Sequence, residues 1–155
     1  MATTVHDVAA AVLSKTGRVS TMKLQKLVYY AQAWTLAITG ECLFPDDIQA
    51  WANGPVCWPL FRRHQGVFSV ETWDGNPCAV GDFEDAIITL VVNKYGPLAS
   101  AQLSDLSHRE APWRQARGAL PDGAYSEAVI TPASMRDYYR QMGGTAELVG
   151  DLLDA

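Results

Sequence analysis

The segment that most constrains the fold is residues 22–38, where apolar side chains recur at the three- and four-residue spacing of a helix. Ser20 or Thr21 stands where an N-cap is expected, and Gly40 stands where a helix stops. The apolar stripe consists of Leu24, Leu27, Val28, Ala31, Trp34 and Ile38. Such a long amphipathic helix needs other elements packed on it, so we predict that it forms the spine of the domain.

Other helical patterns occupy both ends of the chain. Apolar residues of 5–13 recur at helical spacing and end before Gly17. The helix expected after Asp82 is predicted to bury Phe83. Further helices are expected to begin at residues suited to a cap or a first turn, namely Asp82, Ser100, Pro112 and Thr131-Pro132.

The middle of the chain has a different pattern. Residues 48–51 alternate like a short strand before Asn53-Gly54-Pro55 breaks it, and residues 56–64 are typical of a short helix. Residues 67–73 alternate again, and a turn signal within residues 74–80 leads towards a further short segment. These short alternating stretches favour a small β element over a large sheet.

Together these patterns predict a mainly α protein, a compact single-domain helical fold over residues 1–155 with a small β-hairpin or short antiparallel element in the middle. The apolar fraction of 48% and the charged fraction of 19% are those of a globular chain and exclude extended disorder. After Gly143-Gly144 we expect a loosely packed C-terminal helix within residues 143–155.

The charge distribution limits the classes of ligand. The net charge of −5 disfavours nucleic acid as the main partner, because such complexes rely on Lys and Arg to neutralise phosphates. The stretch between Asp7 and Glu41 nevertheless contains no acid and holds Lys15, Arg18, Lys23 and Lys26. No apolar run is long enough to cross a bilayer, no signal peptide is seen, and three unpaired cysteines fit reduced thiols. We therefore expect a cytoplasmic protein that does not bind membranes.

Candidate catalytic and metal sites lack the partner residues that their chemistry requires. His108-Arg109-Glu110 matches half of a zinc deaminase signature, but no cysteine follows Cys78 to complete it. Cys57 beside Pro55 is typical of a small core residue, although pairing with His108 in a hydrolase stays an alternative. No phosphate-binding glycine motif occurs. We predict no enzyme activity, no cofactor, no metal and no catalytic residue.

The run around His108 has a structural interpretation instead. It joins two short helices, in which Ser107 or Glu110 caps backbone donors and Pro112 starts the next helix. Trp113 is expected to anchor that helix in the core, and His108 to bond a nearby carbonyl.

Three separated motifs resemble one known family. They are residues 23–34, residues 48–56, and residues 103–113 followed by Ala116-Arg117. Their order and spacing over about residues 5–142 resemble the Panacea domain, the SocA-like antitoxin family, which also includes phage-associated GepA-type proteins. Asn53 departs from a His that often precedes Gly-Pro-Val in the family, so any role of a histidine at this position is lost. Ser107 replaces the Thr usual before His108.

This resemblance implies a mostly helical antitoxin of a toxin–antitoxin system, which neutralises a cognate, adjacently encoded protein toxin by direct binding, alone or as a hetero-oligomer. One family member instead delivers its toxin to the protease ClpXP, so a proteolytic adaptor is the alternative. A DNA-binding phage-element regulator, or a homo-oligomer, is a further alternative. The candidates for partner contact are Lys23, Lys26, Tyr30, Trp51, Asn53 and Trp58, and those for structural motif residues are Gly54, Pro55, His108, Glu110, Pro112 and Trp113.

Overall fold

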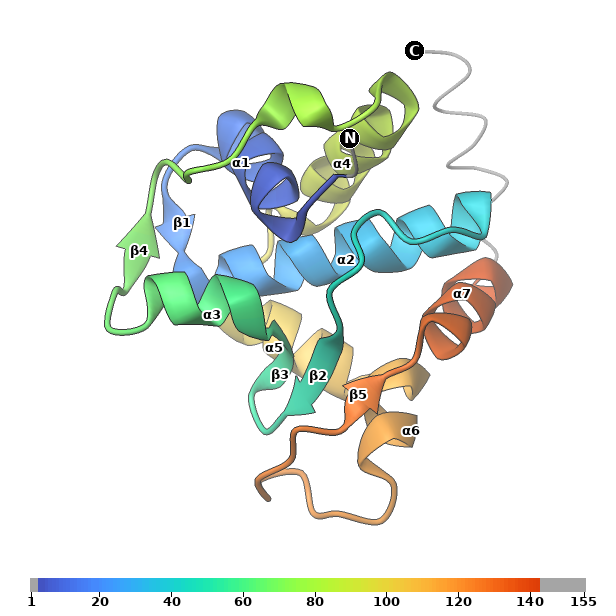
Figure 1. The fold of residues 1–155 in the computed structure, drawn as a ribbon. Coiled ribbons are helices and arrows are strands. Elements are labelled where there is room, and N and C mark those ends of the chain that lie inside the picture. Colours follow the sequence, from blue (N-terminus) through green and yellow to red (C-terminus); the bar gives the residue numbers. More distant parts are fainter. Residues whose placement is uncertain (1–2, 143–155) are drawn as a thin grey trace.

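The computed structural model describes residues 3–142 (Figure 1). Its helices are α1 (Val5–Thr16), α2 (Thr21–Thr39), α3 (Trp58–His64), α4 (Asp82–Tyr95), α5 (Ser100–Arg109), α6 (Ala111–Arg117) and α7 (Pro132–Gln141), with a 3₁₀ turn η1 (Pro77–Ala79). Its strands are β1 (Val19–Ser20), β2 (Ile48–Trp51), β3 (Gly54–Cys57), β4 (Ser69–Val70) and β5 (Val129–Ile130). The fold is mainly α with small antiparallel sheets, as predicted.

Helix α2 is the central element of the fold (Figure 1). It begins where the Ser20 hydroxyl accepts a hydrogen bond from the backbone N–H of Lys23, and it ends at Gly40, whose φ of 81° is left-handed. Helices α1, α4, α5 and α7 and strand β3 all pack against it. Its apolar stripe is buried as predicted, apart from Ile38, which is half-buried at the C-terminal end.

The side of α2 opposite its apolar stripe is buried as well. Lys26 is 1% exposed and Tyr30 is 0% exposed, and Ala33 is buried as well. Elements that lie far apart in the sequence pack on α2 from several directions, so no solvent-facing side remains along the middle of the helix. The spacing of apolar residues in the sequence identifies the most apolar side of a helix, but it does not show what packs on the other sides.

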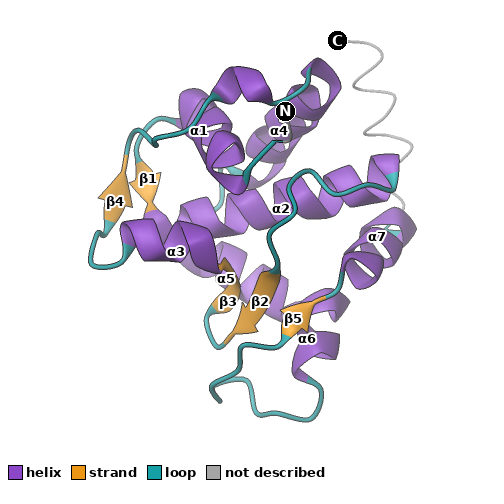
Figure 2. Cartoon of the chain, viewed as in Figure 1, coloured by secondary structure: helices purple, strands orange, loops and turns teal. Residues whose placement is uncertain are grey.

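The small sheets differ in detail from the expected ones (Figure 2). Strands β2 and β3 form an antiparallel hairpin, and β5 joins the other edge of β2. Gly54-Pro55 therefore starts a paired strand, and residues 56–57 belong to β3 and not to the following helix. In the stretch 67–73 only β4 is a strand. It pairs with β1, whereas Pro77–Ala79 forms a 3₁₀ turn.

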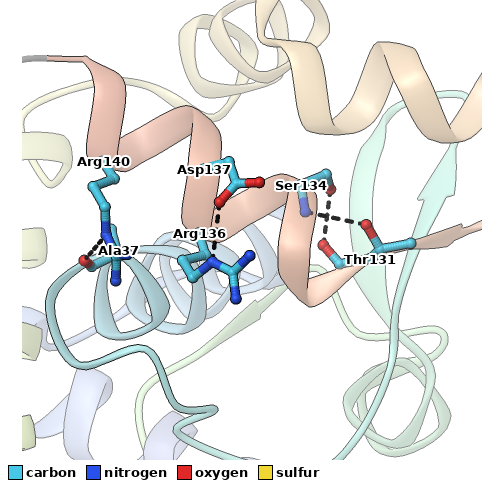
Figure 3. A network of polar contacts seen from close by, with 6 residues as sticks. All are labelled: Ala37, Thr131, Ser134, Arg136, Asp137 and Arg140. Atoms are coloured by element: carbon cyan, nitrogen blue, oxygen red, sulfur yellow. Dashed lines mark hydrogen bonds and ion pairs between the residues drawn. The ribbon is translucent and has the colours of Figure 1, made fainter.

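Helix α7 lies beside the C-terminal half of α2 (Figure 3). It begins as predicted at Thr131-Pro132, where the Thr131 hydroxyl accepts from the backbone N–H of Ser134 at 3.1 Å. At its other end the Arg140 Nε donates to the Ala37 carbonyl at 2.9 Å. This bond ties α7 to α2. The C-terminal helix predicted within residues 143–155 lies outside the described residues.

Helix α4 has a different surface from the predicted one. Gly81 is its N-cap and Asp82 is its first residue. Phe83 is 46% exposed, so the prediction that it is buried is wrong. The packed face is instead formed by Ile87, Ile88, Val91 and Tyr95. Helix α5 likewise has Ala99 as its N-cap, and Ser100 is its first residue rather than its cap.

Candidate protein-binding site

An aromatic cluster lies where β2 meets α3. The ring of Phe61 lies 4.9 Å from that of Trp51 and 5.5 Å from that of Trp58, measured between centroids, and the two indoles lie 6.1 Å apart. Trp58 is 43% exposed, although it belongs to this cluster, and Trp51 and Phe61 are half-buried. A partner that covers these rings would remove a large apolar area from water.

The cluster borders a groove of about 210 Å³. The start of α2, the β2–β3 turn, α3 and the loop before β5 form its walls. The lining residues are Met22, Trp51, Ala52, Asn53, Val56, Phe61, Tyr125 and Ser126. Two of the six residues predicted to contact a partner, Trp51 and Asn53, therefore line one surface, and Trp58 lies next to it.

Hydrogen bonds hold the β2–β3 hairpin that borders this groove. The indole N–H of Trp51 donates to the Gln49 side-chain carbonyl at 2.7 Å, and the Trp51 backbone carbonyl accepts from the Trp113 indole at 2.9 Å. The side-chain amide of Gln25 bonds both the N–H and the carbonyl of Cys57, at 2.9 and 3.2 Å. Because α2 and α6 hold the hairpin in this way, the aromatic rings stand on a rigid base.

The remaining predicted contact residues lie elsewhere. Lys23 is half-buried, and its ammonium group donates to the Gly96 carbonyl at 2.6 Å. Lys26 and Tyr30 were also expected at a partner contact, but both side chains are buried in the described fold because other elements pack on all sides of α2. Neither side chain is on the surface there.

Lys26 occupies an unusual environment. It makes no hydrogen bond or ion pair with any described residue, and burial lowers the pKa of its ammonium group to about 8. Gly54 packs directly on it. A Cβ at that position would lie 2.8 Å from the Lys26 Cε and 3.3 Å from the Ser107 hydroxyl. Gly54 has a φ of 125°, so both its backbone and its lack of a side chain suit this close approach.

Glu110 connects the first and third sequence motifs. Its carboxylate accepts a hydrogen bond from the Tyr30 hydroxyl at 2.6 Å and from the Tyr139 hydroxyl at 3.0 Å. Burial raises the pKa of Glu110, and the two hydroxyl donors oppose this shift. Glu110 was expected to cap backbone donors, but its carboxylate caps neither α5 nor α6.

The rest of the third motif also packs inward. Trp113 is buried as predicted, and Pro112 lies in the first turn of α6. The His108 ring stacks on Trp113 at 4.1 Å, and the Arg117 guanidinium lies 4.7 Å from the Trp113 ring. The expected bond from His108 to a carbonyl is not formed, since its buried Nε2 has no partner among residues 3–142. Stacking on Trp113 fixes the ring instead.

Sequence reasoning missed several residues of the site. Phe61 has the sequence pattern of an ordinary core residue of a short helix, and Tyr125 lies in a loop that only the fold brings to the groove. Arg117 was expected only as part of a motif. Its guanidinium donates to the Ala50 carbonyl at 2.9 Å and to carbonyls of the following loop, and so holds that loop near β2. No local pattern encodes these contacts.

The alternative of a hydrolase finds little chemical support. Burial raises the pKa of the Cys57 thiol to about 12, so the nucleophilic thiolate is scarce at neutral pH. Within the described part of the chain, no hydrogen bond joins Cys57 to His108. No group of three or more His, Cys, Asp or Glu side chains suited to a metal ion occurs among residues 3–142. In the same part of the chain no helix is long and apolar enough to cross a membrane.

The fold and the site together define a mainly helical domain in which three sequence motifs meet around one central helix, beside an exposed aromatic groove. The chain belongs to the antitoxin SocA-like family, Panacea domain, whose family model matches residues 24–114. Comparisons with curated proteins and with solved structures gave no match. The family match covers the three motifs apart from Lys23 and Ala116-Arg117, and every groove residue except Met22, Tyr125 and Ser126.

Proposed function

We propose that this protein is an antitoxin that neutralises an adjacently encoded protein toxin by binding it directly through the aromatic groove. Membership of the antitoxin family supports the class of partner. The exposed Trp58, packed on Phe61 and Trp51, supports the place of contact. Tryptophan is enriched among the residues that dominate binding energy at protein interfaces.

Binding to this groove requires little rearrangement of the antitoxin. The aromatic rings are held by packing and by the hydrogen bonds of Trp51, so the chain loses little conformational freedom when a partner covers them. The same surface suits an inhibitor that occludes its toxin.

The chain acts, in this proposal, in the cytoplasm and without catalysis of its own. The protonated state of the Cys57 thiol supports the second point. Replacing Cys57 with Ala is therefore expected to leave neutralisation unchanged. Loss of neutralisation by a folded Cys57→Ala variant would contradict this part of the proposal.

Co-expression with the protein encoded by the adjacent reading frame tests the proposed function. Induction of that protein alone is expected to arrest growth, and joint expression with this chain is expected to restore it. The half-life of the toxin distinguishes direct binding from delivery to ClpXP. It is expected to be the same with and without active ClpXP, whereas a ClpXP-dependent fall would favour the adaptor mechanism. Continued growth arrest beside well-folded antitoxin would reject the proposal.

A further inference from the structure

The groove has the dimensions of a site for side chains rather than for a small-molecule ligand. Its volume of about 210 Å³ lies below the roughly 300–1,000 Å³ typical of small-molecule pockets. Apolar side chains form most of its wall, among them Met22, Val56 and Phe61. A groove of this kind suits one bulky apolar side chain of a protein partner, inserted as an anchor.

The rim of the groove on the α3 side carries positive charge. Residues 48–70 contain no Asp or Glu, and within them Arg62 and Arg63 are exposed. Arg62 follows Trp58 by four residues on α3, so the two side chains lie on the same face of the helix. Arg62 makes no hydrogen bond or ion pair with the described residues, whereas Arg63 donates to the Asp74 carbonyl at 2.7 Å.

This local charge is opposite to that of the whole chain, whose net charge is −5. The loop side of the groove differs, because the hydroxyl of Tyr125 bonds the Glu127 carboxylate there. A partner segment with carboxylates would therefore meet an attractive rim at α3. A basic segment would meet unpaired positive charge at the same place.

We infer that the groove binds an acidic segment of the toxin, in which one aromatic or large aliphatic side chain enters the groove and a neighbouring carboxylate pairs with Arg62. This inference rests on the proposed function and adds the chemistry of the bound segment. Arginine pairs with carboxylates through two parallel hydrogen bonds. Arg62 therefore orients the bound carboxylate in addition to attracting it by charge. The aromatic rings supply most of the affinity, and the charge of Arg62 raises the rate of association.

Association kinetics test the charge part of the inference. The purified chain and the purified product of the adjacent reading frame are mixed at about 50 mM and about 300 mM NaCl. Arg62→Glu is expected to lower the association rate constant about tenfold at low salt and to weaken its salt dependence. Arg136→Glu makes the same charge change on α7, which lies at the other end of α2 from α3 (Figure 1). This control is expected to leave the association rate constant and its salt dependence unchanged.

A second variant tests the groove itself. Ala52 is half-buried in the groove wall, and Ala52→Phe would fill the space without removing any aromatic ring. The inference predicts at least a tenfold loss of affinity for a variant whose unfolding transition is close to that of the unmodified chain.

The outcomes separate the two claims. If the unmodified chain does not bind or neutralise the neighbouring protein, the proposed function fails and this inference fails with it. If the unmodified chain neutralises the toxin but Arg62→Glu associates as fast as Arg136→Glu, or faster, the acidic segment is excluded and the proposed function stands. Unchanged affinity of a folded Ala52→Phe variant would likewise exclude the groove as the anchor site.

Discussion

The hydroxyl of Tyr30 lies 2.6 Å from the carboxylate of Glu110, and both groups are buried. This bond joins the central helix α2 to the junction of α5 and α6. Tyr139 on α7 donates to the same carboxylate, so one acidic side chain connects three separate parts of the fold. The network is a structural device of the domain and lies away from the exposed groove.

The first prediction concerns this network. Glu110→Ala leaves two buried hydroxyls without their acceptor and is expected to lower the free energy of unfolding by about 2–4 kcal/mol. Glu110→Gln keeps an oxygen acceptor and removes the buried charge, so its effect is expected to stay within about 1 kcal/mol. Urea unfolding of the three proteins at pH 7 measures the difference. Equal losses for both variants would contradict the role of the carboxylate as an acceptor.

The second prediction concerns the pH dependence that Glu110 causes. Its folded pKa is raised above the unfolded value, so the folded state holds the proton more tightly. The contribution of this group to stability is therefore greatest at low pH and falls as pH rises from its unfolded pKa through its raised folded pKa. Glu110→Gln should gain stability relative to the unmodified chain as pH rises from 4 to 7. A stability difference between the two proteins that stays constant from pH 4 to 7 would contradict the raised pKa of Glu110.

The third prediction concerns the buried Lys26. Its folded pKa of about 8 lies below the unfolded value of 10.5, so burial of the charge costs about 3 kcal/mol below pH 8. This cost disappears as pH rises from about 8 towards 10.5. Lys26→Met is expected to be more stable than the unmodified chain by up to this amount at pH 7, and the gap should narrow by pH 10.

The difference in unfolding free energy between Lys26→Met and the unmodified chain isolates the contribution of Lys26. Burial also raises the pKa values of Cys57 and the buried tyrosines, which changes stability at alkaline pH, but these residues are present in both chains. If the difference in unfolding free energy between the two proteins is the same at pH 7 and pH 10, the pKa of Lys26 is not lowered in the folded state.

The fourth prediction concerns Gly54. Gly54→Ala adds a Cβ at a φ of 125° and 2.8 Å from the Lys26 Cε, and is expected to cost about 3 kcal/mol or more. Gly66→Ala is the matched control, since its φ of 83° is also positive and no atom lies within 4 Å of the added Cβ. Its cost is expected to be about 1–2 kcal/mol.

A double variant separates contact from backbone strain at Gly54. Adding Lys26→Ala removes the side chain that the new Cβ would meet, so Gly54→Ala should cost less in that background. If Gly54→Ala costs the same with and without Lys26, or no more than Gly66→Ala, the close packing is not what requires glycine there.

The sequence predicts much of the helical framework because helix ends are encoded locally. Ser20 and Gly40 bound α2, and Thr131-Pro132 starts α7, through bonds within a few residues. Contacts between distant segments are not encoded in this way. Val19–Ser20 pairs with Ser69–Val70, and that choice of partner depends on the whole fold.

The site was predicted only in part, for the same reason. Trp58 and Asn53 are exposed beside the half-buried Trp51, and all three are candidates for partner contact from the sequence. Lys26 and Tyr30 carry polar groups that are usually exposed, but surrounding helices bury them. Tyr125 enters the groove because Arg117 holds its loop by backbone carbonyls, which no side-chain pattern reveals. The binding role of each of these residues stays a prediction.

The affinity of this chain for the product of the adjacent reading frame tests the central claim most directly. Calorimetric titration of the two purified proteins is expected to show a tight complex. Trp58→Ala should raise the Kd about 30-fold or more, as for an interface residue worth about 2 kcal/mol. Phe83→Ala removes an aromatic ring of similar exposure from α4 and should leave the Kd unchanged. No binding by the unmodified chain, or equal Kd values for the two variants, would contradict the account.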